Sequence, residues 1–242
     1  GGYISTPVTV LTPSSPSYSN PAHVHAVTAL STGQTYTYDA NGNMTQRVEG
    51  GVTYTQTFNA ENQLISVTTG GQTTQFLYDG DGNLVRKINP NNTRTIYVSG
   101  VYEVDKAAGG AGGAVTRTVT YYPVAGAMRI NSTLYYILKD HLGSSSVITN
   151  DVGITLGEQR YNSFGTPRVT SGTIFTDRLF TGQRDVGLGL MDYKSRFYLP
   201  SLGRFISADS ITPNGPQGLN RYSYVGNNPI NFTDPTGHME VN

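Results

Sequence analysis

Three segments spaced twenty residues apart share one pattern of aromatic, polar and apolar positions. They run from Tyr36 to Met44, from Gln56 to Leu64 and from Phe76 to Leu84. In each segment an aromatic residue precedes Asp or Asn, and a short polar stretch leads to an apolar residue; the aromatic–polar pairs are Tyr38-Asp39, Phe58-Asn59 and Tyr78-Asp79. Self-similarity at a fixed period indicates stacked units that bury a core only together. Each unit therefore predicts a strand, a tight turn and a return strand.

The turns of the first and third units carry a strong hairpin signal. Gly42 follows Asn41, and Gly82 follows Asp81. Such turns need positive φ, which glycine adopts without steric cost. The second unit has Asn62 at the same place, and Asn is the next most tolerant residue. All three units are thus predicted to form the same hairpin.

The rest of the chain is also rich in strand-forming residues between turn signals. Thr95–Val98 begins a fourth, degenerate unit, and the remaining expected strands are 115–124, 127–130, 134–139, 145–150, 154–161 and 173–175. Residues 185–197 predict a short turn or helix, weakened by Gly187 and Gly189. After Ser201 the density of Pro, Gly and Asn predicts coil with brief strands. The predicted fold is all-β: a spiral, solenoid-like antiparallel sheet of stacked β-hairpin repeats with an irregular, plug-like C-terminal region.

Composition narrows the function. The 242 residues carry sixteen basic and sixteen acidic side chains, only 13% in total, so no basic footprint for nucleic acid appears. Cysteine is absent, which excludes disulfides and thiolate metal sites. No apolar run approaches the roughly 20 residues of a membrane helix. The chain starts Gly1-Gly2, which we interpret as a processed product or a piece of a longer protein.

The repeats resemble the tyrosine-aspartate repeat of the RHS family, and later motifs resemble the C-terminal core region of that family. The matching motifs, in order, are Asp140–Ser144, Tyr161–Gly165, Phe180–Gln183, Gly187-Leu188, Arg196–Tyr198, Gly203–Ile206, Asp209, Leu219–Tyr224, Asn227–Ile230 and Asp234–Gly237. The core-motif residues singled out are Gly182, Arg196, Gly203, Asn228, Pro229, Pro235 and Gly237. The resemblance divides the chain into an extended N-terminal arm or linker (1–35), tyrosine-aspartate repeats (36–104), a Gly/Ala loop (105–115) and an RHS-like core region (116–242).

The resemblance also implies a candidate catalytic site. In the family, the core region can be an aspartate-based self-cleaving element that releases a C-terminal segment, often a toxin, just after the Asp-Pro-x-Gly motif. By position, Asp209 and Asp234 are the candidate carboxylates, with Arg204 expected to hold one of them ionised. Two close carboxylates share a proton and act as acid and base on a water.

Two departures from the family pattern weigh against activity. His238 stands where the family usually has leucine, and Leu199 stands where it usually has an acidic residue. Because Asp beside Pro is also an ordinary way to start a turn, a purely structural role for Asp234 is the alternative that we favour.

Other candidate chemistry gives way to structural explanations. Asp79–Asn83 resembles the opening of a calcium loop, but position twelve is Pro90 rather than Glu. The spacing His23-x-His25 lacks further ligands, and His141 lies beside Asp140 on a strand where neighbours face opposite ways. The recurring rings offer stacking faces for sugars, yet a core ladder explains the period more simply. We predict no metal site and no cofactor.

These observations favour an architectural protein over an enzyme with an external substrate. We predict the terminal wall and plug part of a secreted shell, or of one exposed at a bacterial cell surface, whose partners are other RHS repeats of a longer chain or other copies of itself. The alternatives are the self-cleaving core described above, and an extracellular module that binds carbohydrate or self-assembles through open strand edges. In the last case the segment Val8–Leu11 is a candidate donor strand. Neither nucleic acid nor membrane insertion is expected.

Overall fold

The computed structural model describes residues 15–211 and 219–238, and within them two antiparallel sheets contain all of the strands. The larger has sixteen strands in sequence order, each paired with the next: β1 (Pro16–Ser17), β2 (Ala29–Leu30), β3 (Thr35–Tyr38), β4 (Met44–Glu49), β5 (Val52–Phe58), β6 (Leu64–Thr69), β7 (Gln72–Tyr78), β8 (Leu84–Ile88), β9 (Arg94–Val98), β10 (Tyr102–Lys106), β11 (Val115–Tyr122), β12 (Ala127–Ile130), β13 (Thr133–Lys139), β14 (Ser145–Asn150), β15 (Thr155–Tyr161) and β16 (Pro167–Gly172). We call this sheet, residues 16–172, the wall.

The smaller sheet belongs to what we call the C-terminal unit, residues 173–211 and 219–238. Its strands are β17 (Arg184–Gly187), β18 (Leu190–Asp192), β19 (Phe197–Leu199) and β20 (Arg204–Phe205). Short 3-10 turns accompany them at η3 (Phe180–Gly182) and η5 (Val225–Asn227), while η1 (Gly110–Gly112) and η2 (Pro123–Ala125) lie in the wall. The described residues contain no α-helix.

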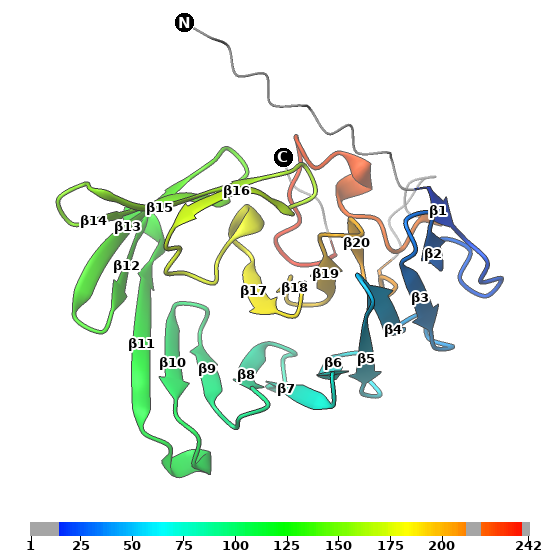
Figure 1. The fold of residues 1–242 in the computed structure, drawn as a ribbon, viewed down its shortest axis with the longest axis horizontal. Helices are drawn as coiled ribbons and strands as arrows, with labels where there is room; N and C mark the ends of the chain where they lie inside the picture. Colours follow the sequence, from blue (N-terminus) through cyan, green and yellow to red (C-terminus); the bar gives the residue numbers. More distant parts are fainter. Residues whose placement is uncertain (1–14, 212–218, 239–242) are drawn as a thin grey trace, which may run out of the picture.

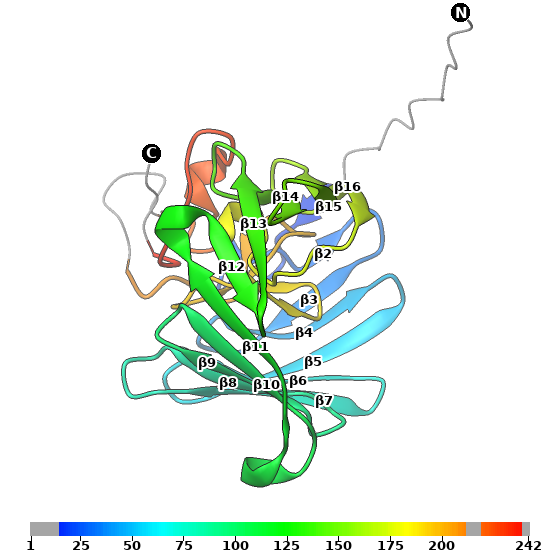
Figure 2. The same cartoon turned by 90° about the vertical axis from the view of Figure 1, so that its left-hand side faces the viewer.

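The wall curls around the C-terminal unit without closing (Figure 1). Among the described strands, β1 and β16 each pair with a single neighbour, and they do not pair with each other. Figure 2 shows the long strand β11 and its neighbours crossing one side of the molecule. The C-terminal unit therefore fills the concave side of an open sheet.

Alternation of inward and outward residues explains where the core lies. In β7, Thr74 and Phe76 are buried while Gln75 between them is exposed. Because successive side chains of a strand point to opposite faces, one face of the wall is apolar and needs a cover. The largest buried cluster mixes both parts: Tyr36, Met44, Leu64, Val67, Phe76, Leu84 and Tyr97 of the wall pack with Val186, Leu190, Phe197, Leu199 and Ile206 of the C-terminal unit.

Most of the predicted strands are present, and one strand prediction was wrong. The expected strands 127–130 and 145–150 coincide with β12 and β14. The strand expected at 173–175 is instead β16, just before it, and Ile174 and Phe175 pack against the cluster around Met128. Of the short turn or helix predicted for 185–197, the turn is present: Leu188 and Gly189 adopt positive φ and join β17 and β18 as a hairpin, and no helix forms there. The candidate donor strand Val8–Leu11 lies outside the described residues.

The Gly/Ala segment is a loop between β10 and β11, which are paired neighbours in the same sheet. The wall continues through it to β16. The division into ranges ending at 35, 104 and 115 stays a prediction. No helix in the described part of the chain is long and apolar enough to cross a membrane.

Candidate functional site

The polar turns of the three repeats share one hydrogen-bond pattern centred on an Asp or Asn side chain. Asp39 Oδ1 accepts the N–H groups of Asn41 and Asn43, both at 2.9 Å. In the same way, the side chains of Asn59 and Asp79 each accept the N–H groups of the residues two and four positions later, at 2.9 to 3.0 Å. The N–H and side-chain bonds from Asn83 lower the pKa of Asp79. A side chain that mimics a backbone acceptor fixes the turn.

The residue three positions after the Asp or Asn adopts positive φ in every copy. The φ values are +87° at Gly42, +61° at Asn62 and +82° at Gly82. The same arrangement recurs at Asp140 with Gly143 and at Asn150 with Gly153. Sequence reasoning missed these later turns as repeat units, although an Asp or Asn followed by Gly at the third position would have revealed them.

The repeat aromatics are half-buried rings with bonded hydroxyl groups. Tyr78 Oη donates to the Leu64 carbonyl at 2.7 Å, and Tyr38 Oη donates to the Val27 carbonyl at 2.9 Å. Burial raises the pKa of both tyrosines. Phe58 lacks a hydroxyl, and Gln56 Nε2 donates to the Met44 carbonyl instead. These contacts support a core ladder, whereas carbohydrate contact stays a prediction.

The motif Asp234–Gly237 forms a tight turn whose two ends, Asp234 and Gly237, are buried. Asp234 Oδ1 accepts the N–H groups of Gly237 at 2.7 Å and Thr236 at 3.1 Å. Gly237 has φ +81°, and a Cβ there would lie 2.4 Å from Ser195 Oγ and 2.8 Å from the Tyr193 carbonyl oxygen. Both the conformation and the close approach therefore require glycine at this position.

Arg196, which precedes β19, joins the two predicted carboxylates. Its Nη2 lies 2.7 Å from Asp209 Oδ2 and 4.0 Å from Asp234 Oδ2. Its Nε donates to the Gly237 carbonyl, and its guanidinium stacks 3.8 Å above the centre of the Phe205 ring. Burial lowers the pKa of Arg196 to about 10, although both carboxylates act to raise it.

Asp209 has a partner at each of its carboxylate oxygens. Oδ2 contacts Arg196, whereas Oδ1 accepts the Ile211 N–H at 2.9 Å and lies 2.7 Å from His238 Nδ1. Asp209 is 4% exposed and Asp234 3% exposed, so neither is solvated as a surface carboxylate would be. The residue directly after the motif thus contacts one of the two candidate aspartates.

The contact that we expected from Arg204 is made by Arg196, so that expectation was wrong. Arg204 Nη1 donates to Asn227 Oδ1 and to the Gly203 carbonyl. Arg204 is nearer to Asp209 in sequence, but β19 and β20 pair antiparallel, and this pairing returns the chain so that Asp209 meets the start of β19. The sequence identified Arg196 only as a core-motif residue. Arg204 was chosen instead because it lies closer to Asp209 along the chain.

The remaining motif residues shape the backbone of the C-terminal unit. Gly182 and Gly203 have φ of +74° and +68°, and a Cβ on Gly203 would approach the Phe164 ring to 3.0 Å. Asn228 accepts the Asn231 Nδ2 at 2.8 Å. Pro229 is buried and Pro235 is half-buried. All of these contacts are structural.

Long-range hydrogen bonds fasten the C-terminal unit to the wall. Tyr222 Oη donates to the Gly42 carbonyl at 2.9 Å, and the Met44 N–H donates to the Ile206 carbonyl at 2.7 Å. Lys87 Nζ donates to the Val186 carbonyl at 3.1 Å, and Arg47 donates to the Leu188 carbonyl. Arg47 and Lys87 occupy the same position of the first and third repeats, so the repeat places cations against the β17–β18 hairpin.

An open repeat wall around an irregular C-terminal unit defines a shell-like β module. The sequence pattern of the RHS Repeat family matches residues 58–95, and that of the Teneurin YD-shell family matches residues 122–230. The chain belongs to the RHS, or tyrosine-aspartate repeat, family.

Curated relatives include toxins. The tRNA3(Ser)-specific nuclease WapA of Bacillus spizizenii is 32% identical over 221 residues, which cover 85% of this chain and 9% of that protein. Toxin subunit YenC1 of Yersinia entomophaga is 27% identical over 232 residues, covering 83% of this chain and 23% of that protein. The chain thus spans about a tenth to a quarter of these relatives.

Solved structures share the fold. The crystal structure of TcdB2-TccC3-Cdc42 superimposes with a TM-score of 0.66 at 21% identity, over 85% of this chain and 13% of that chain. A crystal structure of TcdB2-TccC3 gives a TM-score of 0.65 at 23% identity. The chain is an RHS-repeat, shell-like structural module related in sequence to YenC1 and WapA.

Proposed function

We propose that this chain is the terminal wall and plug segment of a larger RHS shell that is secreted or exposed at a bacterial cell surface. The observation that carries the proposal is the shared core in which wall residues such as Leu64 and Phe76 pack against Leu190 and Phe197. A concave face that is filled by its own C-terminal unit ends a shell, and leaves no room there for a cargo.

The strand edges suggest how the shell continues. Among the described strands, β1 and β16 have one neighbour each, and unpaired backbone groups of an edge strand accept a further strand. We infer that preceding repeats of a longer chain extend the wall beyond β1, which fits the small share of each relative that this chain spans. Other copies of the chain are the alternative occupants of these edges.

Cryo-electron microscopy of the complete native gene product tests this role. The expected map shows further tyrosine-aspartate hairpins continuing the sheet from β1, with the C-terminal unit closing the end of the enclosed space. A native product without additional strands, in particles no larger than this chain, would contradict the shell and favour the free-standing module.

Self-cleavage is the second candidate, favoured by the guanidinium of Arg196 between the Gly237 carbonyl and two buried carboxylates. A hydrogen bond from a cation polarises that carbonyl and stabilises the charge that develops on its oxygen. Water would add to the carbonyl carbon while Asp209 or Asp234 takes its proton. The proton would then pass to the His238 nitrogen as the Gly237–His238 bond breaks.

Intact-mass measurement after incubation tests this candidate. The wild-type chain is expected to shorten to a product ending at Gly237, and Asp209→Asn to keep its full mass. Asp151→Asn, an exposed residue at the tip between β14 and β15, is the matched control and should behave as the wild type. Equal masses for the wild type and Asp209→Asn would refute self-cleavage and leave the structural turn.

A further inference from the structure

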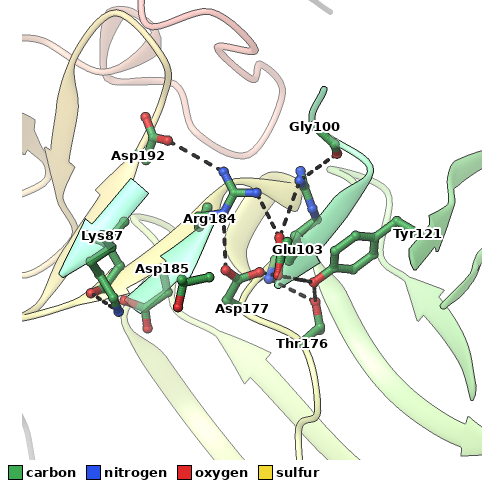
Figure 3. A network of polar contacts seen from close by, with 12 residues as sticks. Lys87, Gly100, Glu103, Tyr121, Thr176, Asp177, Arg184, Asp185 and Asp192 are labelled. Atoms are coloured by element: carbon green, nitrogen blue, oxygen red, sulfur yellow. Dashed lines mark hydrogen bonds and ion pairs between the residues drawn. The ribbon is translucent and has the colours of Figure 1, made fainter. Parts of the chain in front are cut away.

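A cluster of charged side chains lies where the wall meets the C-terminal unit (Figure 3); three of them are buried, and Asp177 and Arg178 are about a quarter exposed. Arg184 of β17 lies at its centre: Nη2 is 2.8 Å from Glu103 Oε1 of β10, and Nε is 3.2 Å from Asp177 Oδ2. Its Nη1 is 3.8 Å from Asp192 Oδ2 of β18. The side chains of Arg184, Glu103 and Asp192 are 9%, 3% and 6% exposed. We use the name Arg184 cluster for five residues: Arg184, Glu103, Asp177, Asp192 and Arg178.

Groups from every neighbouring element face this cluster. Arg178 Nη2 lies 3.8 Å from Glu103 and donates to the Gly100 carbonyl at 2.7 Å. Tyr121 of β11 donates to Asp177 Oδ1 at 3.1 Å, and the Arg184 guanidinium stacks 3.9 Å above the centre of the Tyr97 ring of β9. The further charged groups beside it are Asp185 of β17 and Lys87 of β8, together with Lys194 and Asp79, which line the adjoining cavity.

Negative charge exceeds positive charge in the cluster. Glu103, Asp177 and Asp192 face two guanidinium groups, those of Arg184 and Arg178. A buried carboxylate without a full counter-charge is costly, and a proton removes that cost. The geometry alone therefore favours the uptake of a proton when the C-terminal unit is seated.

The protonation behaviour of the individual acids agrees with this count. Burial, followed by the charge of Asp177, raises the pKa of Glu103, although Arg184 and Arg178 act to lower it. Burial also raises the pKa of Asp192 against the effect of Arg184, and that of Asp185. Each of these acids holds a proton to higher pH in the folded chain than in the unfolded one.

Protons can reach the cluster through solvent. A cavity of about 620 Å³ between the wall and the C-terminal unit is lined by Arg178, Arg184 and Asp192, together with Tyr97 and Gly100. A polar cavity of this size admits water. Changes of external pH are therefore felt at the cluster without unfolding of the chain.

We propose that the Arg184 cluster is a proton-operated latch that fastens the C-terminal unit to the wall in acid and loosens it as the pH rises. The latch spans the two parts, because Glu103 belongs to the wall whereas Arg184 and Asp192 belong to the C-terminal unit. Its use in opening a shell rests on the function proposed above, but the coupling itself is a property of this chain.

The direction in which stability changes with pH follows from the raised pKa values of the buried acids. A group whose pKa is higher in the folded state contributes stability that is complete below its unfolded value and is lost as the pH rises through the folded value. For Glu103 the loss begins above its ordinary pKa of 4.5. The C-terminal unit is therefore held most firmly at mildly acidic pH and less firmly at neutral pH.

Hydrogen exchange of β17 and β18 between pH 5 and 8, corrected for the intrinsic exchange rate at each pH, tests the latch. In the wild type their protection is expected to fall with rising pH, by at most about tenfold per pH unit for one proton. Glu103→Gln keeps the shape and a hydrogen-bond acceptor without the charge, so its protection should fall less steeply with rising pH than that of the wild type, and the remaining fall belongs to Asp192 and Asp185. Glu61→Gln, an exposed residue, is the matched control and should follow the wild type.

Asp192→Asn is the second variant, and we expect it to reduce the pH dependence in the same way. Flat protection in the wild type, or the same fall in Glu103→Gln as in the wild type, would overturn the latch. Either outcome is read on this chain alone, so it is separate from whether the native gene product forms a shell.

Discussion

The wall and the C-terminal unit are both β structure, but contacts of different range hold them together. In the wall each strand pairs with the next one along the chain, and the same Asp or Asn turn returns between β3 and β4, β5 and β6, and β7 and β8. The C-terminal unit has only four short strands and depends on distant partners, such as Gly42 for Tyr222 and Glu103 for Arg184. We therefore expect substitutions to be better tolerated in the wall than in the C-terminal unit, whose contacts each depend on one distant partner.

The largest expected loss of stability is in the aromatic core of the C-terminal unit, compared with an exposed position of the wall. Phe205 is 1% exposed, and its ring packs edge-on against those of Tyr193 and Tyr198. Phe205→Ala should lower the free energy of unfolding by about 3–5 kcal/mol in urea titrations, because a cavity replaces the ring. Val124→Ala, at a fully exposed position of the wall, should change it by less than about 0.5 kcal/mol. A small loss for Phe205→Ala would mean that the C-terminal unit is loosely packed.

Two glycines that both adopt positive φ sharpen the comparison. Gly50, between β4 and β5, has φ +58° and open space around it, whereas Gly237 has φ +81° and atoms within 3 Å. Gly50→Ala should cost about 1–2 kcal/mol, the strain of a left-handed residue alone. Gly237→Ala should cost more by thermal or urea unfolding, because backbone and side chain of the C-terminal unit must move. Equal losses would show that the Asp234–Gly237 turn has room to adjust.

The smallest effect concerns the hydroxyl of one repeat ring. Tyr78→Phe removes the bond to the Leu64 carbonyl and should lower the free energy of unfolding by about 0.5–1.5 kcal/mol. Tyr102→Phe, at an exposed position of β10, is the control and should be nearly neutral. An equal loss of unfolding free energy at both positions would contradict the structural role that we assign to the hydroxyl of Tyr78.

The hairpin turns of the wall could be predicted from the sequence, because the contacts that fix each turn span only five residues. Asp39, Gly42 and their equivalents set each turn through contacts within the turn itself, and the alternation around Phe76 sets the inward face. The extent of the wall was harder to predict, since Asp140 and Asn150 carry the turn without the aromatic residue that marked the early repeats. Strand boundaries such as that of β16 depended on packing of the following Ile174 and Phe175.

By itself, the sequence determined an all-β chain of repeated hairpins, the RHS family and the pair Asp209 and Asp234. Only the tertiary structure decided that Arg196 rather than Arg204 joins those carboxylates, and that Glu103 of the wall meets Arg184 of the C-terminal unit. The physical reason is the range of the interactions. Turns and alternation are fixed by neighbours along the chain, whereas buried charges find their partners only after the wall has curled and its concave face has been filled.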